Sequence, residues 1–232
     1  MILIKTIVFL QRLIQKTGMA DNYLEKRYEE VFGGRGGAAK VTPHKPSLDT
    51  LLLKNRSFRG YDISYEVHPL QLRAIVAVNS KVASSVNMQS LRFKLVTKGD
   101  QARIVLSHIR MGRALPELHL PFPGTEPESF IIVCTTVPEN PSVDIDLGIS
   151  LQSMLLKAVE LGLGGLIIRN FDRAELKVEL GLELDPVAVL AIGRPAEKIS
   201  LVPVHEGEDL AYYRKDGVHY VPKIVPEDLI IE

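Results

Sequence analysis

The segment between Asp146 and Gly165 constrains the fold of this chain more than any other part of the sequence. Its apolar residues recur at the three- and four-residue spacing of an α-helix. They are Leu147, Leu151, Met154, Leu155, Ala158 and Val159. We expect a helix that opens at Asp146 and ends in the glycines from Gly162 to Gly165. Because its apolar arc is wide, the helix must be buried on several sides, and burial between two subunits is one way to achieve this.

Strand-like segments lie on both sides of this helix. Alternation or continuous apolar character predicts strands over residues 91–97, 130–137, 166–168 and 187–192. Further helices are expected near Ser47 to Asn55 and from Pro69, and Ile104 to Leu106 fits either a short strand or a helix. Helices and strands mix without regular βαβ alternation, so the predicted fold class is α+β.

We divide the chain into three parts. Residues 1–46 are predicted to be a helical extension with a glycine-rich linker, 47–198 the core, and 199–232 an extended tail that packs on another surface, such as a second chain. Residues 1–18 are too short to span a membrane, which takes about 20 apolar residues. We favour an accessory helix there over a membrane-surface helix. The glycines from Gly33 to Gly37 follow no strand, which argues against a dinucleotide fingerprint.

Composition excludes several classes of function. The 28 basic residues balance the 28 acidic ones, which argues against binding of nucleic acid. The single cysteine, Cys134, excludes an intrachain disulfide and fits a reducing compartment, so a cytoplasmic location is predicted. The six histidines lack the spacing of metal ligands. Asp144 and Asp146 are better explained as helix-capping residues than as metal ligands.

A cluster of basic and hydroxyl side chains points to a bound anion. Arg56, Ser57 and Arg59 lie within four residues of one another, and Ser84, Ser85 and Asn87 follow after one helical segment. A guanidinium forks onto phosphate oxygens, and a hydroxyl adds a further donor. The alternative is that the arginines are solvated surface cations and that the serines and the asparagine satisfy a local turn.

Four blocks together resemble the nitroreductase family of flavin mononucleotide (FMN) oxidoreductases. They are Arg56–Tyr61, Ala83–Phe93, the segment from Asp146 to Gly165, and Pro186–Pro195. The resemblance rests on the order and spacing of these blocks and covers roughly Leu51 to Lys198. The chain also departs from the family pattern. Asn55 stands where many members have arginine, Ala83 replaces proline, Ser90-Leu91 replaces Pro-Trp, and Arg169-Asn170 lacks the Glu-Gly of some members.

The resemblance implies a sandwich in which helices flank an antiparallel sheet. It also implies a homodimer that exchanges C-terminal segments and binds two FMN molecules at its interface. Carried over by position, Arg56 and Ser57 would hold the phosphate or ribityl chain, and Arg59 would approach the N1 and O2 edge of the ring. The remaining expected contacts are Ser84, Ser85 and Asn87 from the partner subunit, the backbone of Arg169 and Asn170 near N5, and Lys223 at the phosphate.

The implied activity is that of an FMN-dependent oxidoreductase. NADH or NADPH would supply hydride, and a small electron-poor acceptor such as a nitroaromatic or a quinone would receive the electrons. Because the flavin N5 carries this chemistry, no residue of the chain is predicted to be catalytic. The alternative is a flavin-binding protein with little turnover that serves storage or sensing.

Overall fold

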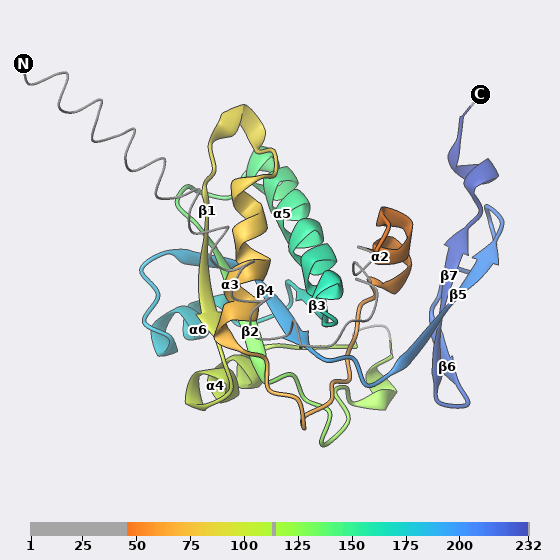
Figure 1. The fold of residues 1–232 in the computed structure, drawn as a ribbon, viewed down its shortest axis with the longest axis horizontal. Coiled ribbons are helices and arrows are strands. Elements are labelled where there is room, and N and C mark those ends of the chain that lie inside the picture. Colours follow the sequence, from red (N-terminus) through yellow and green to blue (C-terminus); the bar gives the residue numbers. More distant parts are fainter. Residues whose placement is uncertain (1–45, 113–114, 232) are drawn as a thin grey trace, which may run out of the picture. The chain divides into compact units, whose positions relative to one another are not determined.

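The computed structural model describes residues 46–112 and 115–231, so the predictions for residues 1–18 and for the glycine-rich linker lie outside the described residues. The centre of this part is a four-stranded sheet in the order β1-β2-β4-β3 (Figure 1). Its strands are β1 (Leu91–Val96), β2 (Ser129–Thr135), β3 (Gly164–Ile168) and β4 (Asp185–Gly193). Every neighbouring pair is antiparallel, which confirms the predicted α+β class with an antiparallel sheet.

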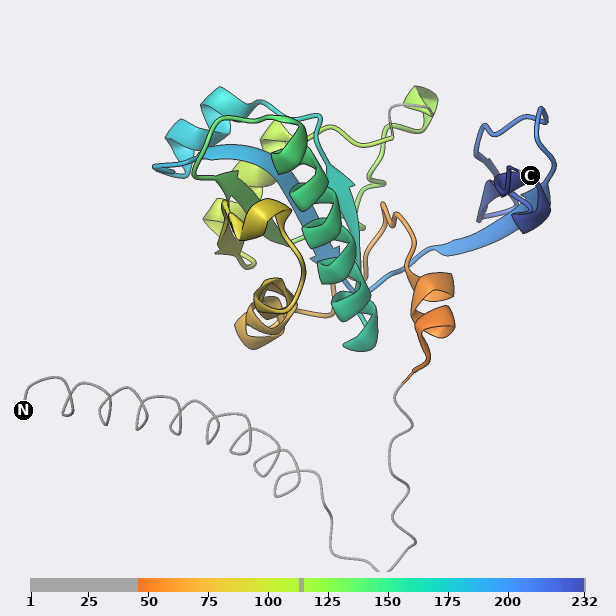
Figure 2. The same cartoon turned by 90° about the horizontal axis from the view of Figure 1, so that it is seen from above.

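Helices cover both faces of this sheet. The helices α3 (Pro69–Val76) and α5 (Pro141–Glu160) pack against one face, where Ile131, Leu190 and Met154 belong to one buried apolar cluster. The helices α4 (Asp100–His108) and α6 (Arg173–Glu179) pack against the other face, where Phe130 and Val105 belong to a second buried apolar cluster (Figures 1 and 2). All seven residues of β2 are buried, which explains its continuous apolar sequence. Each fully buried large apolar side chain contributes about 1.5–3 kcal/mol.

The long helix α5 begins five residues earlier than the sequence predicts. Asn140 is its N-cap and accepts hydrogen bonds from the backbone N–H groups of Ser142 and Val143. The expected start at Asp146, and the interpretation of Asp144 and Asp146 as capping residues, are therefore wrong. Asp146 is 4% exposed, and its Oδ1 accepts a hydrogen bond of 2.7 Å from the backbone N–H of Ser85. Its carboxylate thus holds a distant loop and not the end of its own helix.

Two shorter helices begin at the expected residues. Ser47 caps α2 (Leu48–Lys54), and Pro69 occupies the first turn of α3 behind the cap His68. Ile104 to Leu106 belongs to the helix α4 and not to a strand. The helix α6 has no counterpart among the predicted elements. No helix within residues 46–112 and 115–231 is both long enough and apolar enough to cross a membrane.

The segment after Pro195 forms a second sheet of three strands. They are β5 (Lys198–Val204), β6 (Tyr213–Lys215) and β7 (Val218–Ile224), in the order β5-β7-β6. The strands β5 and β7 pair in parallel, whereas β6 and β7 form an antiparallel hairpin. The segment predicted to be an extended tail therefore has a hydrogen-bonded ladder of its own.

The loop from Ser84 to Gln89 has an unusual backbone. Val86, Asn87 and Gln89 all have left-handed φ angles, of 44°, 57° and 48°. Such an angle is a genuine outlier for β-branched valine and costs of order 1–3 kcal/mol. The side chain of Val86 is 89% exposed, so burial does not repay this strain. Besides Asp146, the hydroxyl of Ser84 holds the loop by accepting a hydrogen bond of 3.2 Å from the N–H of Gln89.

Replacing Val86 by glycine should raise the free energy of unfolding by about 1 kcal/mol, because glycine adopts this φ without a steric penalty. Met88, in the same loop, has an ordinary helical φ of −65° and supplies a matched control. Met88→Gly should lower the free energy by up to about 1 kcal/mol. Urea denaturation measures both changes. Equal losses in the two variants would show that Val86 is not strained.

Candidate functional site

A cavity of about 400 Å³ lies between the first sheet and the second. The loop after α2, the outer face of α5, β3, β5 and β7 all contribute to its wall. Its lining comprises Leu52, Asn55, Arg56, Ser57, Arg59, Gln152, Leu155, Ile167, Ile199, Tyr212, His219, Val221 and Lys223. We call this the cationic cavity.

Two buried aromatic residues hold the loop that carries the arginines. The backbone N–H of Phe58 donates to the carbonyl of Gly165 in β3 at 3.1 Å, and the Tyr61 hydroxyl donates to the carbonyl of Phe58 at 2.8 Å. The two rings lie directly on glycines. A Cβ at Gly164 would come within 2.5 Å of the Phe58 ring, and one at Gly193 within 2.6 Å of the Tyr61 ring. These close approaches require glycine, and they fix the backbone on both sides of Arg59.

The cationic cavity has the electrostatics of an anion site. Arg56, Arg59 and Lys223 line it, and its described lining includes no carboxylate. The Nε atoms of Arg56 and Arg59 are buried and have no hydrogen-bond partner among the described residues. Burial also lowers the pKa of Arg56, because desolvation disfavours the charged form. An unsatisfied buried donor costs about 1–3 kcal/mol, so an anionic ligand that supplies acceptors would be stabilised there.

A buried carboxylate ties the second sheet to this loop. Glu197 accepts hydrogen bonds from the backbone N–H groups of Arg59 and Gly60, the latter at 3.2 Å, and pairs with Arg214 of β6. The side chains of Glu197 and Arg214 are only 7% and 17% exposed. Glu197 therefore joins the arginine loop to the hairpin of β6 and β7, which directly follows Tyr212 and carries His219 and the far wall of the cavity.

Comparison with known proteins identifies the family. The family model for nitroreductases matches residues 52–194, more than half of the 232-residue chain. The chain belongs to the nitroreductase family. Membership places it among oxidoreductases, and it confirms the resemblance drawn from the four sequence blocks. No curated protein matches the chain.

Solved structures of the family share the fold at low sequence identity. A nitroreductase family protein from Streptococcus pneumoniae TIGR4 is 16% identical, with 80% of this chain and 99% of that chain covered and a TM-score of 0.57. An FMN and NADPH-dependent nitroreductase from Sphigopyxis sp. strain HMH is 19% identical, with 65% and 89% covered and a TM-score of 0.54. A putative nitroreductase from Desulfovibrio desulfuricans, in complex with FMN, is 24% identical, with 63% and 85% covered and a TM-score of 0.52.

The structure brings four of the nine predicted site residues together. Arg56, Ser57, Arg59 and Lys223 all line the cationic cavity. Ser84, Ser85 and Asn87 lie in the strained loop near the start of α5, where Ser84 lines a separate cavity of about 260 Å³. This loop contacts Asp146, whereas the cationic cavity contacts Leu155, about 13 Å further along α5.

Arg169 and Asn170, the remaining two predicted residues, follow β3. The Arg169 guanidinium pairs with Glu139 at 2.7 Å and with Asp144 at 2.8 Å. The carbonyl of Asn170 accepts a hydrogen bond of 3.0 Å from the N–H of Arg110. Neither residue lines the cationic cavity.

Sequence reasoning missed several residues of the cavity wall, including Tyr212, His219 and Gln152. A usable signal was present, because His219, Val221 and Lys223 recur every second residue and so share one face of β7. Gln152 stood in a family block without an assigned role. Its Oε1 is 3.4 Å from Nδ2 of Asn55, so the residue that replaces the family arginine is paired with an amide of α5.

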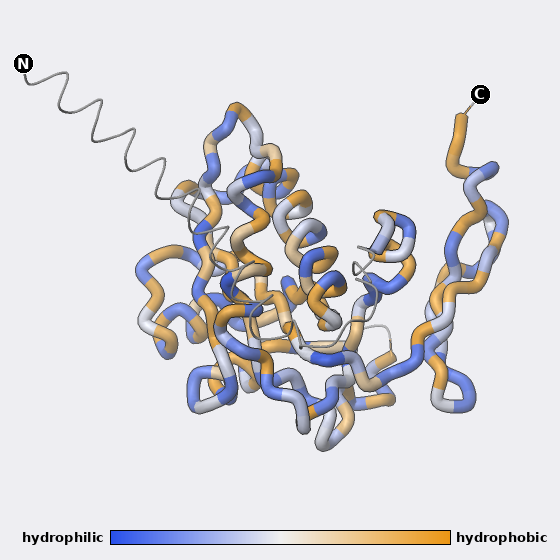
Figure 3. Tube along the Cα trace, in the orientation of Figure 1, coloured by the Kyte–Doolittle hydropathy of each residue, from blue (hydrophilic) through white to orange (hydrophobic). Residues whose placement is uncertain are grey.

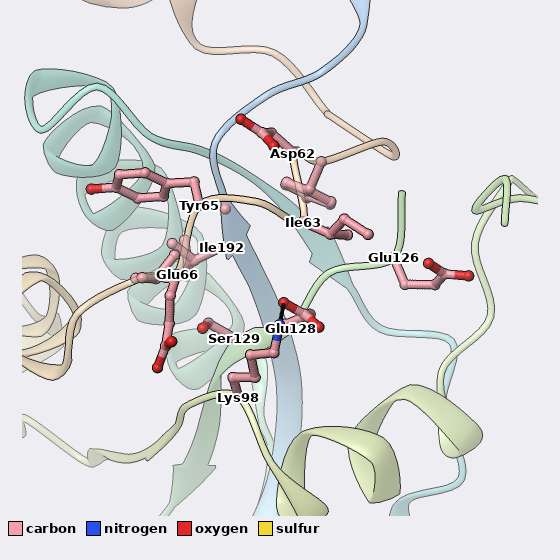
Figure 4. Close-up of a pocket in the computed structure, with 12 residues that line it drawn as sticks. Asp62, Ile63, Tyr65, Glu66, Lys98, Glu126, Glu128, Ser129 and Ile192 are labelled. Atoms are coloured by element: carbon pink, nitrogen blue, oxygen red, sulfur yellow. Dashed lines mark hydrogen bonds and ion pairs between the residues drawn. The ribbon is translucent and has the colours of Figure 1, made fainter. Parts of the chain in front are cut away.

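Another cavity, shown in Figure 4, cannot hold a cofactor. Its volume is about 10 Å³, which is room for a single water. Four of its twelve lining residues carry carboxylates, and Lys98 pairs with one of them, Glu128, at 2.8 Å. Within the described part of the chain, no group of three or more histidine, cysteine, aspartate or glutamate side chains could hold a metal ion.

Glu197→Gln should lower the free energy of unfolding by about 3 kcal/mol, because it leaves the largely buried charge of Arg214 without its partner. Asp100→Asn breaks the exposed pair with Arg103 in α4 and should change the free energy by no more than about 0.5 kcal/mol. Thermal and urea unfolding measure both variants. A loss at Glu197 no larger than that at Asp100 would contradict its assignment as the link between the two sheets.

Proposed function

We propose that this nitroreductase family protein is an FMN-dependent oxidoreductase that uses NADH or NADPH to reduce small electron-poor acceptors such as nitroaromatics or quinones. The observation that carries the proposal is the cationic cavity. Among the described residues it is lined by three cations and no carboxylate, and two guanidinium nitrogens find no partner there. Its volume of about 400 Å³ falls within the range of about 300–1,000 Å³ that is common for ligand sites.

The residues present fit FMN in chemistry as well as in charge. Arg56, Ser57 and Lys223 offer donors for a phosphate group and the ribityl chain. Leu155 and Ile167 offer an apolar surface for the ring; Ile167 is the exposed residue of the otherwise buried β3. Arg59 would stand at the N1 and O2 edge, where a cation favours the negative charge of reduced flavin. When bound, FMN would supply the redox chemistry that carries electrons from the nucleotide to the acceptor.

We further propose that the site is completed by a second copy of the chain. Within one chain the loop of Ser84, Ser85 and Asn87 does not line the cationic cavity, so these residues would reach the flavin from the partner subunit. Apolar side chains are exposed on α2, on α5 and at the C-terminal end, which is hydrophobic in Figure 3. Exposed apolar patches of this kind mark interfaces. They comprise Leu48, Leu52, Leu53, Ile145, Leu229, Ile230 and Ile231.

The purified protein should bind FMN and show the absorbance of oxidised flavin. Arg56→Gln should weaken FMN binding about tenfold or more, because it removes a charge-assisted hydrogen bond, and it should affect riboflavin, which lacks the phosphate, much less. Arg103→Gln, on the exposed face of α4, is the control and should change neither affinity. Quenching of flavin fluorescence measures all of these affinities.

A wild-type protein that stays colourless after FMN is added would overturn the proposal. Equal losses of FMN and riboflavin affinity in Arg56→Gln would instead remove Arg56 from the phosphate end and leave flavin binding in place.

The alternative function is flavin binding with little turnover, for storage or sensing. The amide contact of Asn55 with Gln152 favours it, because it leaves this position without the positive charge of an arginine. Oxidation of NADH and NADPH with nitro and quinone acceptors separates the two functions. Bound flavin that neither nucleotide reduces would support storage or sensing. The cytoplasmic location and the role of residues 1–18 stay predictions.

Ile145→Asp should convert a dimer to monomers and weaken FMN binding, because it places a charge on the exposed face of α5. Val178→Asp, on α6 at the other face of the sheet, should leave the dimer intact. Sedimentation velocity, with and without FMN, measures both. A wild-type protein that binds FMN as a monomer would contradict a site shared between two subunits.

A further inference from the structure

A buried histidine of β7 takes no part in the assignments above. His219 is 1% exposed, and its Nδ1 is buried without a hydrogen-bond partner among the described residues. Its ring packs against the Tyr212 ring at a centroid distance of 5.0 Å, and Tyr212 lies beneath the Arg59 guanidinium at 5.1 Å. Arg59, Tyr212 and His219 therefore form one row of contacts, in which the Tyr212 and His219 ring planes are tilted by 58°, and all three line the cationic cavity.

The surroundings of His219 keep its ring neutral. Burial lowers its pKa below the ordinary value of 6.5, and the positive charges of Arg59 and Arg214 lower it further. Glu197 opposes this effect but does not outweigh it. Arg56, from the loop after α2, and Lys223, on the same strand, add further positive charge to the cavity. A neutral imidazole has one ring nitrogen that donates a hydrogen bond and one that accepts.

Few side chains in the described lining of this cavity can accept a hydrogen bond. Arg56, Arg59 and Lys223 can only donate hydrogen bonds. The amides of Asn55 and Gln152 contact each other. Besides the hydroxyls of Ser57 and Tyr212, His219 is the side chain of the described lining that can accept a hydrogen bond from a ligand N–H, and its Nδ1 is buried without a partner among the described residues. A ligand edge that alternates carbonyl oxygens with an N–H matches this pairing of an arginine with a neutral imidazole.

The position of His219 along β7 separates it from the phosphate end. His219 and Lys223 share a face of the strand but are four residues apart, about 13 Å at the rise of a β-strand. Tyr212 contacts both His219 and Arg59, and Arg59 is expected at the pyrimidine edge of the flavin. Lys223 is expected at the phosphate. The two residues of β7 would therefore contact opposite ends of one ligand.

We propose that His219 is a specificity-determining contact for the flavin ring, which exchanges a hydrogen bond with the pyrimidine edge beside Arg59. The proposal rests on the proposed function, because it requires that the cationic cavity binds flavin. It adds a residue that recognises the flavin ring. This residue belongs to the second sheet and lies outside the four sequence blocks that resemble the family.

Two substitutions separate this role from simple packing under Tyr212. His219→Phe keeps an aromatic ring against Tyr212 and removes both ring nitrogens, whereas His219→Gln keeps one hydrogen-bond donor and one acceptor. His219→Phe should weaken FMN and riboflavin binding by the same factor, about three- to tenfold. His219→Gln should restore part of that affinity. Lys223→Gln is the matched comparison on the same strand face and should weaken FMN while leaving riboflavin within about twofold.

Fluorescence titration at pH 7.5 with FMN and with riboflavin gives these affinities, and thermal unfolding shows whether each variant is folded. In the wild-type protein, the ¹⁵N resonances of the His219 ring should shift when riboflavin is added, and this measurement decides the question if the Phe variant does not fold. A His219→Phe variant that binds both flavins like wild type, a loss confined to FMN, or unshifted ring resonances would each overturn the inference while leaving the proposed function intact. A wild-type protein that binds no flavin would overturn both.

Discussion

The buried carboxylate of Glu197 is the interaction on which the arrangement of this molecule depends. It satisfies two backbone N–H groups of the arginine loop and the guanidinium of Arg214 at once, so one side chain connects three segments that are distant in sequence. Buried ion pairs contribute little net stability compared with apolar packing, but removing one partner is costly. The effect is therefore to fix one geometry. Through these contacts the carboxylate ties the second sheet, which forms one wall of the cationic cavity, to the arginine loop.

The core of the fold was predictable because burial leaves a clear pattern. The apolar run from Phe130 to Cys134 predicts the buried strand β2, and the spacing of Leu147, Leu151 and Met154 predicts the helix α5. Its start was misplaced because Asp146 resembles a cap by residue type, although Asn140 followed by Pro141 gives the stronger local signal. Only the tertiary contact with Ser85 explains why an aspartate lies buried in the second turn.

The candidate site was predictable only in part, for a different reason. Arg56, Ser57 and Arg59 are neighbours in sequence, so a motif could find them, and Lys223 followed from the resemblance. His219 and Tyr212 reach the cavity through strand pairing, which a motif does not encode. The dipeptide Asp216-Gly217, with φ angles of 50° and 74°, was an available hairpin signal, and it would have predicted that β6 and β7 lie side by side.

The parallel pairing of β5 with β7 has a consequence for the cavity. A tight turn cannot join two parallel strands, so after Val204 the chain must return along the whole length of β5 before it can enter β7 at Val218. That return path is where Tyr212 and Arg214 lie. A connection that topology makes unavoidable thus carries both the aromatic ring beneath Arg59 and the cation that pairs with Glu197. In this family member, the chain reversal needed to close a small sheet also builds one wall of the candidate site.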